Sequence, residues 1–76
     1  MTRNEMIEAL ENGICNVEFI KVKDGTIRTM NATLMEDFTE DYDGVEQLYN
    51  GNITVVDVDK NALRSFRVAN VKSFVA

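Results

Sequence analysis

One stretch decides the fold of this 76-residue chain: ICNVEFIKVKDGTIRTMNA, residues 14–32. From Cys15 to Phe19 apolar and polar residues alternate, which is the period of a strand with one buried face. The dipeptide Asp24-Gly25 follows, and between two strand-like runs it is the strongest short-range signal for a hairpin. The residues after it are again rich in β-branched side chains. The stretch therefore predicts a β-hairpin over about residues 14–32.

The alternation changes phase within this hairpin. Apolar residues at Ile20 and Val22 break the parity, which indicates a bulge or a bend from one side of a barrel to the other. In the return strand, Arg28 shares a face with Met30. From the whole pattern we expect six residues to contribute to one core: Val17, Phe19, Ile27, Val56, Phe66 and Val68.

The N-terminal segment has the pattern of a short helix. Thr2 followed by Glu5 is a capping box, and Gly13 is a typical helix stop. Met6, Ile7 and Leu10 recur at helical spacing between them. We expect a helix over about residues 3–12 that covers one open end or face of the sheet.

Beyond the first hairpin, the chain predicts an acidic connection and a second hairpin. Residues 33–52 lack strand alternation, and within them Val45 to Leu48 is expected to form a turn of helix or a short strand. A β-branched run, a turn at Asp59-Lys60-Asn61-Ala62 and a further strand predict a hairpin over about residues 53–69. Apolar residues in 70–76 predict a closing segment.

These elements predict one mainly β domain over residues 1–76. A chain of this length supports a single core. Short strands joined by tight turns favour a small SH3-like barrel of about five strands, because closure removes exposed sheet edges. The short N-terminal α-helix completes this fold class.

The composition excludes several kinds of chemistry. The chain has no histidine and one cysteine, so a structural zinc site with four Cys or His ligands is excluded. A Ser–His or Cys–His nucleophile is excluded as well, and no phosphate-binding P-loop is present. We expect Cys15 to be a buried apolar side chain. The chain is therefore predicted to be a binding protein without cofactor or metal, and not an enzyme.

The net charge of −5 hides an uneven distribution. Six of the thirteen acidic residues cluster in one segment: Glu36, Asp37, Glu40, Asp41, Asp43 and Glu46. The remaining seven acidic and eight basic residues nearly balance. A basic face can therefore coexist with an acidic loop, and each is a separate candidate binding surface.

Two segments resemble a known family. LRSFRVANV, residues 63–71, resembles the strand of WYL domains in which an arginine, an aromatic residue and a second arginine precede a buried aliphatic residue. DGTIRTMNATL, residues 24–34, is similar to the corresponding hairpin of small WYL-like, Sm/SH3-type barrel proteins of tailed bacteriophages. The resemblance implies an SH3-type barrel from a phage. By position it assigns ligand-binding arginines at Arg28, Arg64 and Arg67, while Ala69 and Asn70 replace a charged pair of the family pattern.

The family's larger members sense nucleotide-related or nucleic-acid ligands, so the resemblance implies a phage accessory module that recognises phosphates. Strand parity places Arg64 and Arg67 on opposite faces, with Arg64 near a barrel rim and Arg67 outward. Lys21, Lys23 and Lys72 could supplement such a site. The alternative is that these arginines are solvated and pair with Glu18, Asp57 or another carboxylate.

The acidic segment supports a second functional class, a module that binds a host protein. Aromatic residues interleave with its charges, and aromatic residues are frequent interface hot spots. The segment lacks the ligand spacing of an EF-hand, and a solvated loop is the structural alternative. The candidate partner-binding residues are Phe38, Glu40, Asp41, Tyr42, Asp43 and Tyr49.

The chain contains no apolar run of about 18 residues and no signal-peptide pattern at its start. We therefore expect a cytoplasmic protein without a membrane partner, in the host cytoplasm if it is phage-encoded. A monomer or a weak homodimer is expected.

Overall fold

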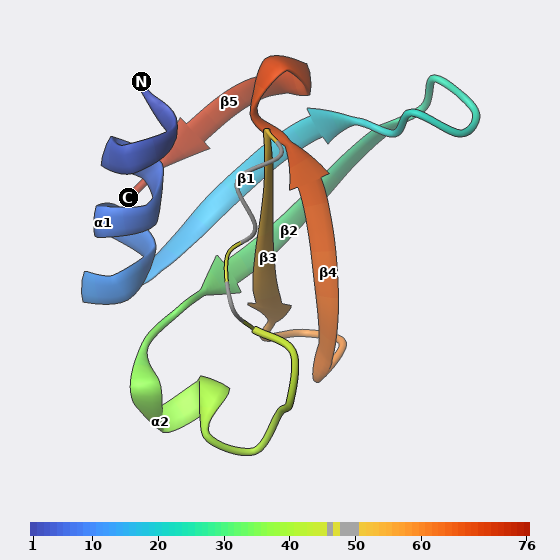
Figure 1. The fold of residues 1–76 in the computed structure, drawn as a ribbon. Coiled ribbons are helices and arrows are strands. Elements are labelled where there is room, and N and C mark those ends of the chain that lie inside the picture. The colour runs from blue at the N-terminus through green and yellow to red at the C-terminus, as the bar shows by residue number, and fades with distance from the viewer. Residues whose placement is uncertain (46, 48–50) are drawn as a thin grey trace.

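The computed structural model describes residues 1–45, 47 and 51–76, and these form a five-stranded antiparallel sheet with an N-terminal helix (Figure 1). The prediction of a mainly β fold with a short N-terminal helix is confirmed. In chain order the elements are α1 (Arg3–Asn12), β1 (Ile14–Ile20), β2 (Ile27–Thr33), α2 (Glu36–Thr39), β3 (Asn52–Asp57), β4 (Ala62–Arg67), the 3₁₀ turn η1 (Val68–Asn70) and β5 (Val71–Val75).

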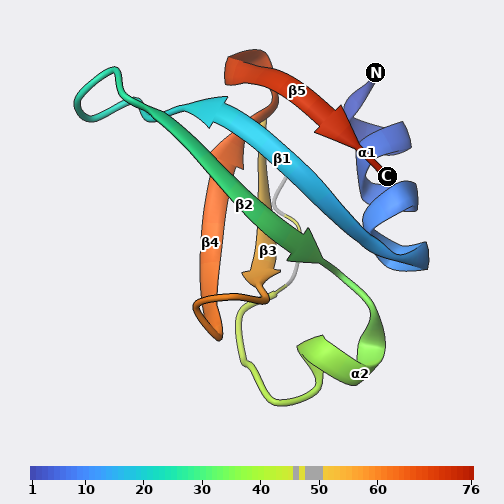
Figure 2. The same ribbon diagram turned by 180° about the vertical axis from the view of Figure 1, so that it is seen from behind.

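The sheet consists of two hairpins, which pair with each other over a short distance, and of β5, which pairs with β1. Its strand order is β4-β3-β2-β1-β5. Strands β1 and β2 pair along their whole length, as do β3 and β4. Within the described residues, β2 pairs with β3 only at Ala32–Asp57 and Thr33–Val56, and we call these two pairs the seam. Beyond the seam the hairpins diverge, and Figure 2 shows the β1–β2 loop reaching away from β4.

A side chain from the acidic connection bonds to β3 beyond the seam. The Thr54 N–H donates to Gln47 Oε1 at 2.9 Å, and Gln47 Nε2 donates to the Thr54 carbonyl at 2.6 Å. Buried backbone groups without partners are costly. The Gln47 amide therefore takes the place of a neighbouring strand at this position.

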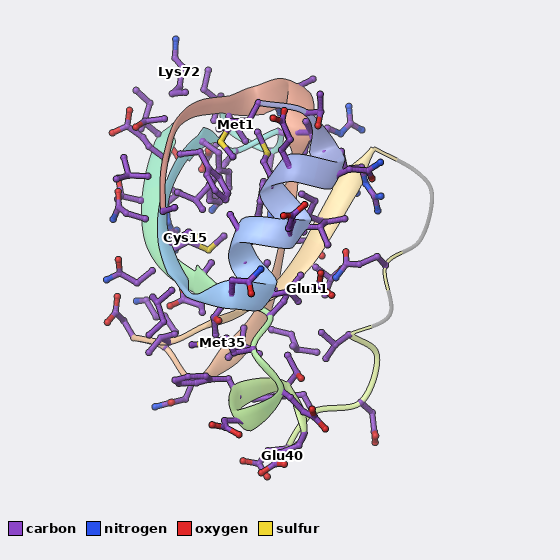
Figure 3. The ribbon with its side chains drawn as sticks, turned by 90° about the vertical axis from the view of Figure 1, so that its left-hand side faces the viewer. Met1, Glu11, Cys15, Met35, Glu40 and Lys72 are labelled. Carbon is purple, nitrogen blue, oxygen red and sulfur yellow. The ribbon has the colours of Figure 1, made fainter. Side chains whose placement is uncertain are left out.

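Helix α1 covers the curved sheet, as Figure 3 shows from the helix side. Its capping box is present: the Glu5 N–H donates to Thr2 Oγ1 at 3.2 Å, and the Thr2 N–H donates to Glu5 Oε1 at 2.8 Å. The apolar side of the helix packs on the strands. The core residues are Met6, Leu10, Cys15, Val17, Met30, Ala32, Ile53, Val55 and Phe66.

The predicted core requires one correction. Ile27 is 58% exposed. Across the β1–β2 ladder Arg28 lies opposite Phe19, so Arg28 shares the inner face and its neighbour Ile27 must face outward. Of the other predicted core residues, Val17, Val56 and Phe66 are buried, and Phe19 and Val68 are partly buried against the core.

The first hairpin forms as predicted, with a longer loop than the Asp24-Gly25 signal alone suggests. Residues 21–26 separate the strands, closed by the Lys21 N–H bond to the Thr26 carbonyl at 2.8 Å. Gly25 has a φ of 71°, a left-handed conformation that suits glycine. The register irregularity lies between β1 and β5, at Glu18/Phe19, and not at positions 20–22.

The acidic connection contains a helical turn, but at a different place from the prediction. Helix α2 spans Glu36–Thr39, and acidic residues in its first turn suit the positive end of a helix dipole. Val45 and Gln47 lie in neither a helix nor a strand, and residues 46 and 48 of the predicted turn lie outside the described residues. The closing segment forms β5, which pairs with β1. No helix within the described parts is long and apolar enough to cross a membrane.

Candidate functional site

A cleft of about 260 Å³ lies where the two hairpins diverge, at the end of the sheet away from the seam. One wall comes from the end of β1, its loop and the start of β2, and the other from the start of β3 and the end of β4. Among the described residues, five basic side chains line this basic cleft: Lys21, Lys23, Arg28, Arg64 and Arg67.

Strand geometry brings the three predicted arginines together. Arg28 lies on the inner face of β2 and is half-buried. Arg64 lies two residues before the buried Phe66, so both side chains share one face of β4. Arg67 has the opposite parity, which predicted an outward orientation. It lines the cleft nevertheless, together with Ser65, at the end of β4.

No carboxylate lines the cleft in the part of the chain that the structure describes. The expected pairing of these arginines with Glu18 or Asp57 is not found there. Asp57 is buried, and its Oδ1 instead accepts the backbone N–H groups of Asp59 and Lys60, both at 3.1 Å. Within residues 1–45, 47 and 51–76, the one ion pair joins Lys21 Nζ and Asp24 Oδ2 at 4.0 Å.

Asp24 is held ionised beside this wall of the cleft. The Thr26 hydroxyl donates to Asp24 Oδ1 at 2.7 Å and the Thr26 N–H donates to it at 3.0 Å. These bonds, the hydroxyl first, lower the pKa of the Asp24 carboxyl. The contact with Lys21 is long and exposed, so it contributes little stability and leaves Lys21 free to move toward a ligand.

The floor of the cleft is apolar. The rings of Phe19 and Phe66 lie with centroids 5.7 Å apart and planes tilted by 33°. Phe66 is 3% exposed and Phe19 is partly buried, so this floor is continuous with the core. An apolar boundary lowers the local dielectric constant and strengthens the attraction between the arginines and an anion. Guanidinium groups bind phosphate or carboxylate oxygens in bidentate fashion, and the cleft is thus suited to an anionic ligand.

The family comparison agrees with this architecture. The family model described as WYL_2, Sm-like SH3 beta-barrel fold, matches residues 3–72. The chain belongs to this family. The match covers the helix, both hairpins and the start of β5, so the resemblance of residues 24–34 and 63–71 to WYL-like barrels is confirmed at the level of the fold family. No curated protein and no solved structure matches the chain.

The second candidate surface of this WYL_2 chain is the acidic end, defined as residues 36–45. Glu40, Asp41 and Asp43 are exposed, whereas Phe38 and Tyr42 are half-buried. Figures 1 and 2 place α2 at the opposite end of the molecule from the β1–β2 loop, and Figure 3 shows Glu40 at this extremity. Tyr49, the remaining predicted partner-binding residue, lies outside the described residues. No group of three metal-ligating side chains occurs within the described segments.

Two features of the site could not be identified from the sequence. The pairing of Phe19 with Phe66 as a floor depends on how the hairpins cross, which no local pattern specifies. Asn52 also lines the cleft, and its only sequence signal is a position in a turn. Lys72, by contrast, was expected to supplement the site and is not among the lining residues.

Proposed function

We propose that this WYL_2 chain is a non-enzymatic binding module that takes the phosphate groups of a nucleotide or nucleic acid in the basic cleft. One observation carries the proposal: Arg28, Arg64 and Arg67 line a single cleft with Lys21 and Lys23, and no described carboxylate lines it with them. Arginines that form structural ion pairs would have acidic neighbours. These three are instead available to an anion from outside the chain.

The geometry and partial burial of the arginines favour specific binding of phosphate over a general electrostatic attraction to anions. Planar guanidinium groups match the spacing of phosphate oxygens. Partial burial of Arg28 and the apolar floor reduce screening by water and salt, so the contacts hold at moderate ionic strength. The sequence resemblance to small barrels of tailed phages supports an accessory role during infection, in the host cytoplasm.

The test is direct binding to phosphate ligands with a charge-matched control. Fluorescence anisotropy of a labelled single-stranded oligonucleotide and a labelled nucleotide is measured at low salt for the native chain, R64Q/R67Q and K60Q/K72Q. Both double variants remove two positive charges, but neither Lys60 nor Lys72 lines the cleft. We expect at least a tenfold loss for R64Q/R67Q and less than a twofold change for K60Q/K72Q. Equal losses, or no binding by the native chain, would refute the proposal.

A second candidate function is capture of a host protein by the acidic end. The observation that favours it is the combination of the exposed Glu40, Asp41 and Asp43 with the half-buried Phe38 and Tyr42. Charged rims around aromatic residues are typical of protein interfaces. Pull-down from host lysate with the native chain and with E40Q/D41N/D43N tests it. A basic protein that the native chain captures and this variant loses supports the candidate, and capture that is unchanged in the variant argues against it.

A further inference from the structure

The charge density of the basic cleft specifies its ligand more closely. We infer that the preferred ligand is a chain of contiguous phosphates, as in a nucleoside triphosphate or free tripolyphosphate, and not the spaced phosphodiesters of a nucleic-acid strand. The inference rests on the proposed function, since it assumes that the cleft binds phosphate. It adds the class of ligand and the arrangement of its charges.

The first argument is the number of cations around a small volume. In the described part of the chain, five basic side chains line a cleft with a volume of about 260 Å³. This volume is slightly below the roughly 300–1,000 Å³ of common small-molecule pockets. A phosphodiester supplies one charge per nucleotide, and a cleft of this size holds a short piece of a strand. A terminal phosphate monoester carries about −1.5 to −2 near neutral pH, and each further phosphate of a condensed chain adds charge at an adjacent phosphorus. Only a condensed chain concentrates enough negative charge to match the cleft.

The second argument is that the cations approach from two sides. Arg28, Lys21 and Lys23 belong to the first hairpin, whereas Arg64 and Arg67 belong to the second. A ligand that satisfies both walls must present phosphate oxygens in more than one direction. A single monoester does so from the three terminal oxygens of one phosphorus, whereas a chain of two or three linked phosphates does so from adjacent phosphorus atoms and offers each wall a charged group of its own.

The third argument concerns divalent cations. Mg²⁺ in phosphate-transfer sites is held by protein carboxylates together with phosphate oxygens. No described residue of the cleft offers a carboxylate, and Asp24 already accepts two bonds from Thr26. The arginines and Mg²⁺ therefore compete for the same phosphate oxygens, and the cleft is built for the metal-free ligand.

Isothermal titration of the full chain tests the inference with four probes at equal ionic strength: ATP, sodium tripolyphosphate, AMP and a ten-nucleotide oligothymidylate. We expect ATP and tripolyphosphate each to bind at least tenfold more tightly than AMP and than the oligonucleotide. Excess Mg²⁺ should weaken ATP binding severalfold. Equal affinities for ATP and tripolyphosphate would show that the phosphates alone are recognised. Tighter binding of ATP would show an additional contact with the nucleoside. Both results support the inference.

Other outcomes overturn the inference in distinguishable ways. Tighter binding of the oligonucleotide, or equal binding of AMP and ATP, refutes the contiguous-phosphate ligand and leaves the proposed function standing. Strengthening of ATP binding by Mg²⁺ also refutes it. Absence of binding for all four probes refutes both proposals. R64Q/R67Q must lose the preference for ATP over AMP while K60Q/K72Q keeps it, because only the first variant removes charge from the cleft.

Discussion

The two ends of the molecule carry opposite charges, and the secondary structure that supports these charges differs between them. The basic cleft is built on paired strands and on Phe66, which is part of the core. The acidic end stands on a four-residue helix whose N-cap residue, Met35, makes no side-chain capping bond. Charges on rigid strands can form a site of defined geometry, whereas charges on a short uncapped helix present a surface without fixed spacing.

Under the proposals above, the two surfaces suit different kinds of partner. A small ligand requires convergent groups at fixed positions, which the hairpins supply in Arg28 and Arg64. A protein partner tolerates adjustment of side chains at an interface. The predictions below test the contrast, in order of decreasing effect.

The largest effect is expected for the floor of the cleft. Phe66→Ala removes a ring that is 3% exposed, and it should lower the free energy of unfolding by about 3–5 kcal/mol. Phe38→Ala, at the acidic end, removes a half-buried ring and should cost no more than half as much. Chemical denaturation of both variants measures the difference.

The milder Phe66→Leu keeps most of the volume and should cost less than about 1.5 kcal/mol, so it provides a folded control. If Phe38→Ala were as destabilising as Phe66→Ala, the acidic end would be as well anchored as the cleft. The contrast between the two ends would then be wrong.

The next largest effect is a difference in ATP affinity between variants of two arginines of the cleft. Arg28 is half-buried opposite Phe19, and Arg67 is exposed at the end of β4. Arg28→Gln should therefore weaken ATP binding by about 1.5–3 kcal/mol, the range for hydrogen bonds to charged groups. Arg67→Gln should cost no more than about 1 kcal/mol, as for an exposed ion pair. Calorimetric titration of each single variant decides the order, and the reverse order would place the ligand on the outer rim.

A smaller effect should appear at two glycines with the same backbone conformation. Gly25 in the β1–β2 loop and Gly44 at the acidic end have φ values of 71° and 84°, and neither has an atom within 4 Å of an added Cβ. Gly25→Ala and Gly44→Ala should each cost about 1–2 kcal/mol of stability from left-handed strain. Only Gly25→Ala should also weaken ATP binding, because its loop carries Lys21 and Lys23. Loss of binding in both variants would mean that the two ends are coupled.

The smallest effect is expected when the acidic end is neutralised. E40Q/D41N/D43N changes exposed charges at the opposite end of the molecule from the β1–β2 loop, and 0.1 M salt screens interactions between exposed charges that lie far apart. ATP affinity should stay within twofold of the native value at this ionic strength. A rise of tenfold or more in affinity would show that the acidic end acts on the cleft directly.

The sequence predicted the local elements of this fold well. Alternation from Cys15 to Phe19 and the Thr2–Glu5 capping box are local signals, and both the strand and the helix form where they indicate. Ile27 was assigned to the wrong face, because hydrophobicity was given more weight than the parity that puts Arg28 inside. Helix α2 was not predicted, since a single short turn has little periodicity to detect.

The geometry of the candidate site could not be predicted from the sequence. The family resemblance named Arg28, Arg64 and Arg67, and the fold brings them to one cleft. Strand parity placed Arg64 and Arg67 on opposite faces of the strand, yet both line the cleft. Which residues of the two hairpins line one cleft depends on the sheet order, which a sequence pattern does not specify.

The two residue pairs of the seam join the two hairpins. A bond from the Val58 N–H to the Asn31 carbonyl at 2.9 Å lies next to them. A second connection joins the hairpins, because β5 follows β4 through η1 and pairs with β1 over Asn16 to Phe19. The Asn70 side chain adds to this connection, since its Nδ2 donates to the Ile20 carbonyl at 3.3 Å. The two hairpins are therefore joined twice, and the walls of the cleft are in place before a ligand binds.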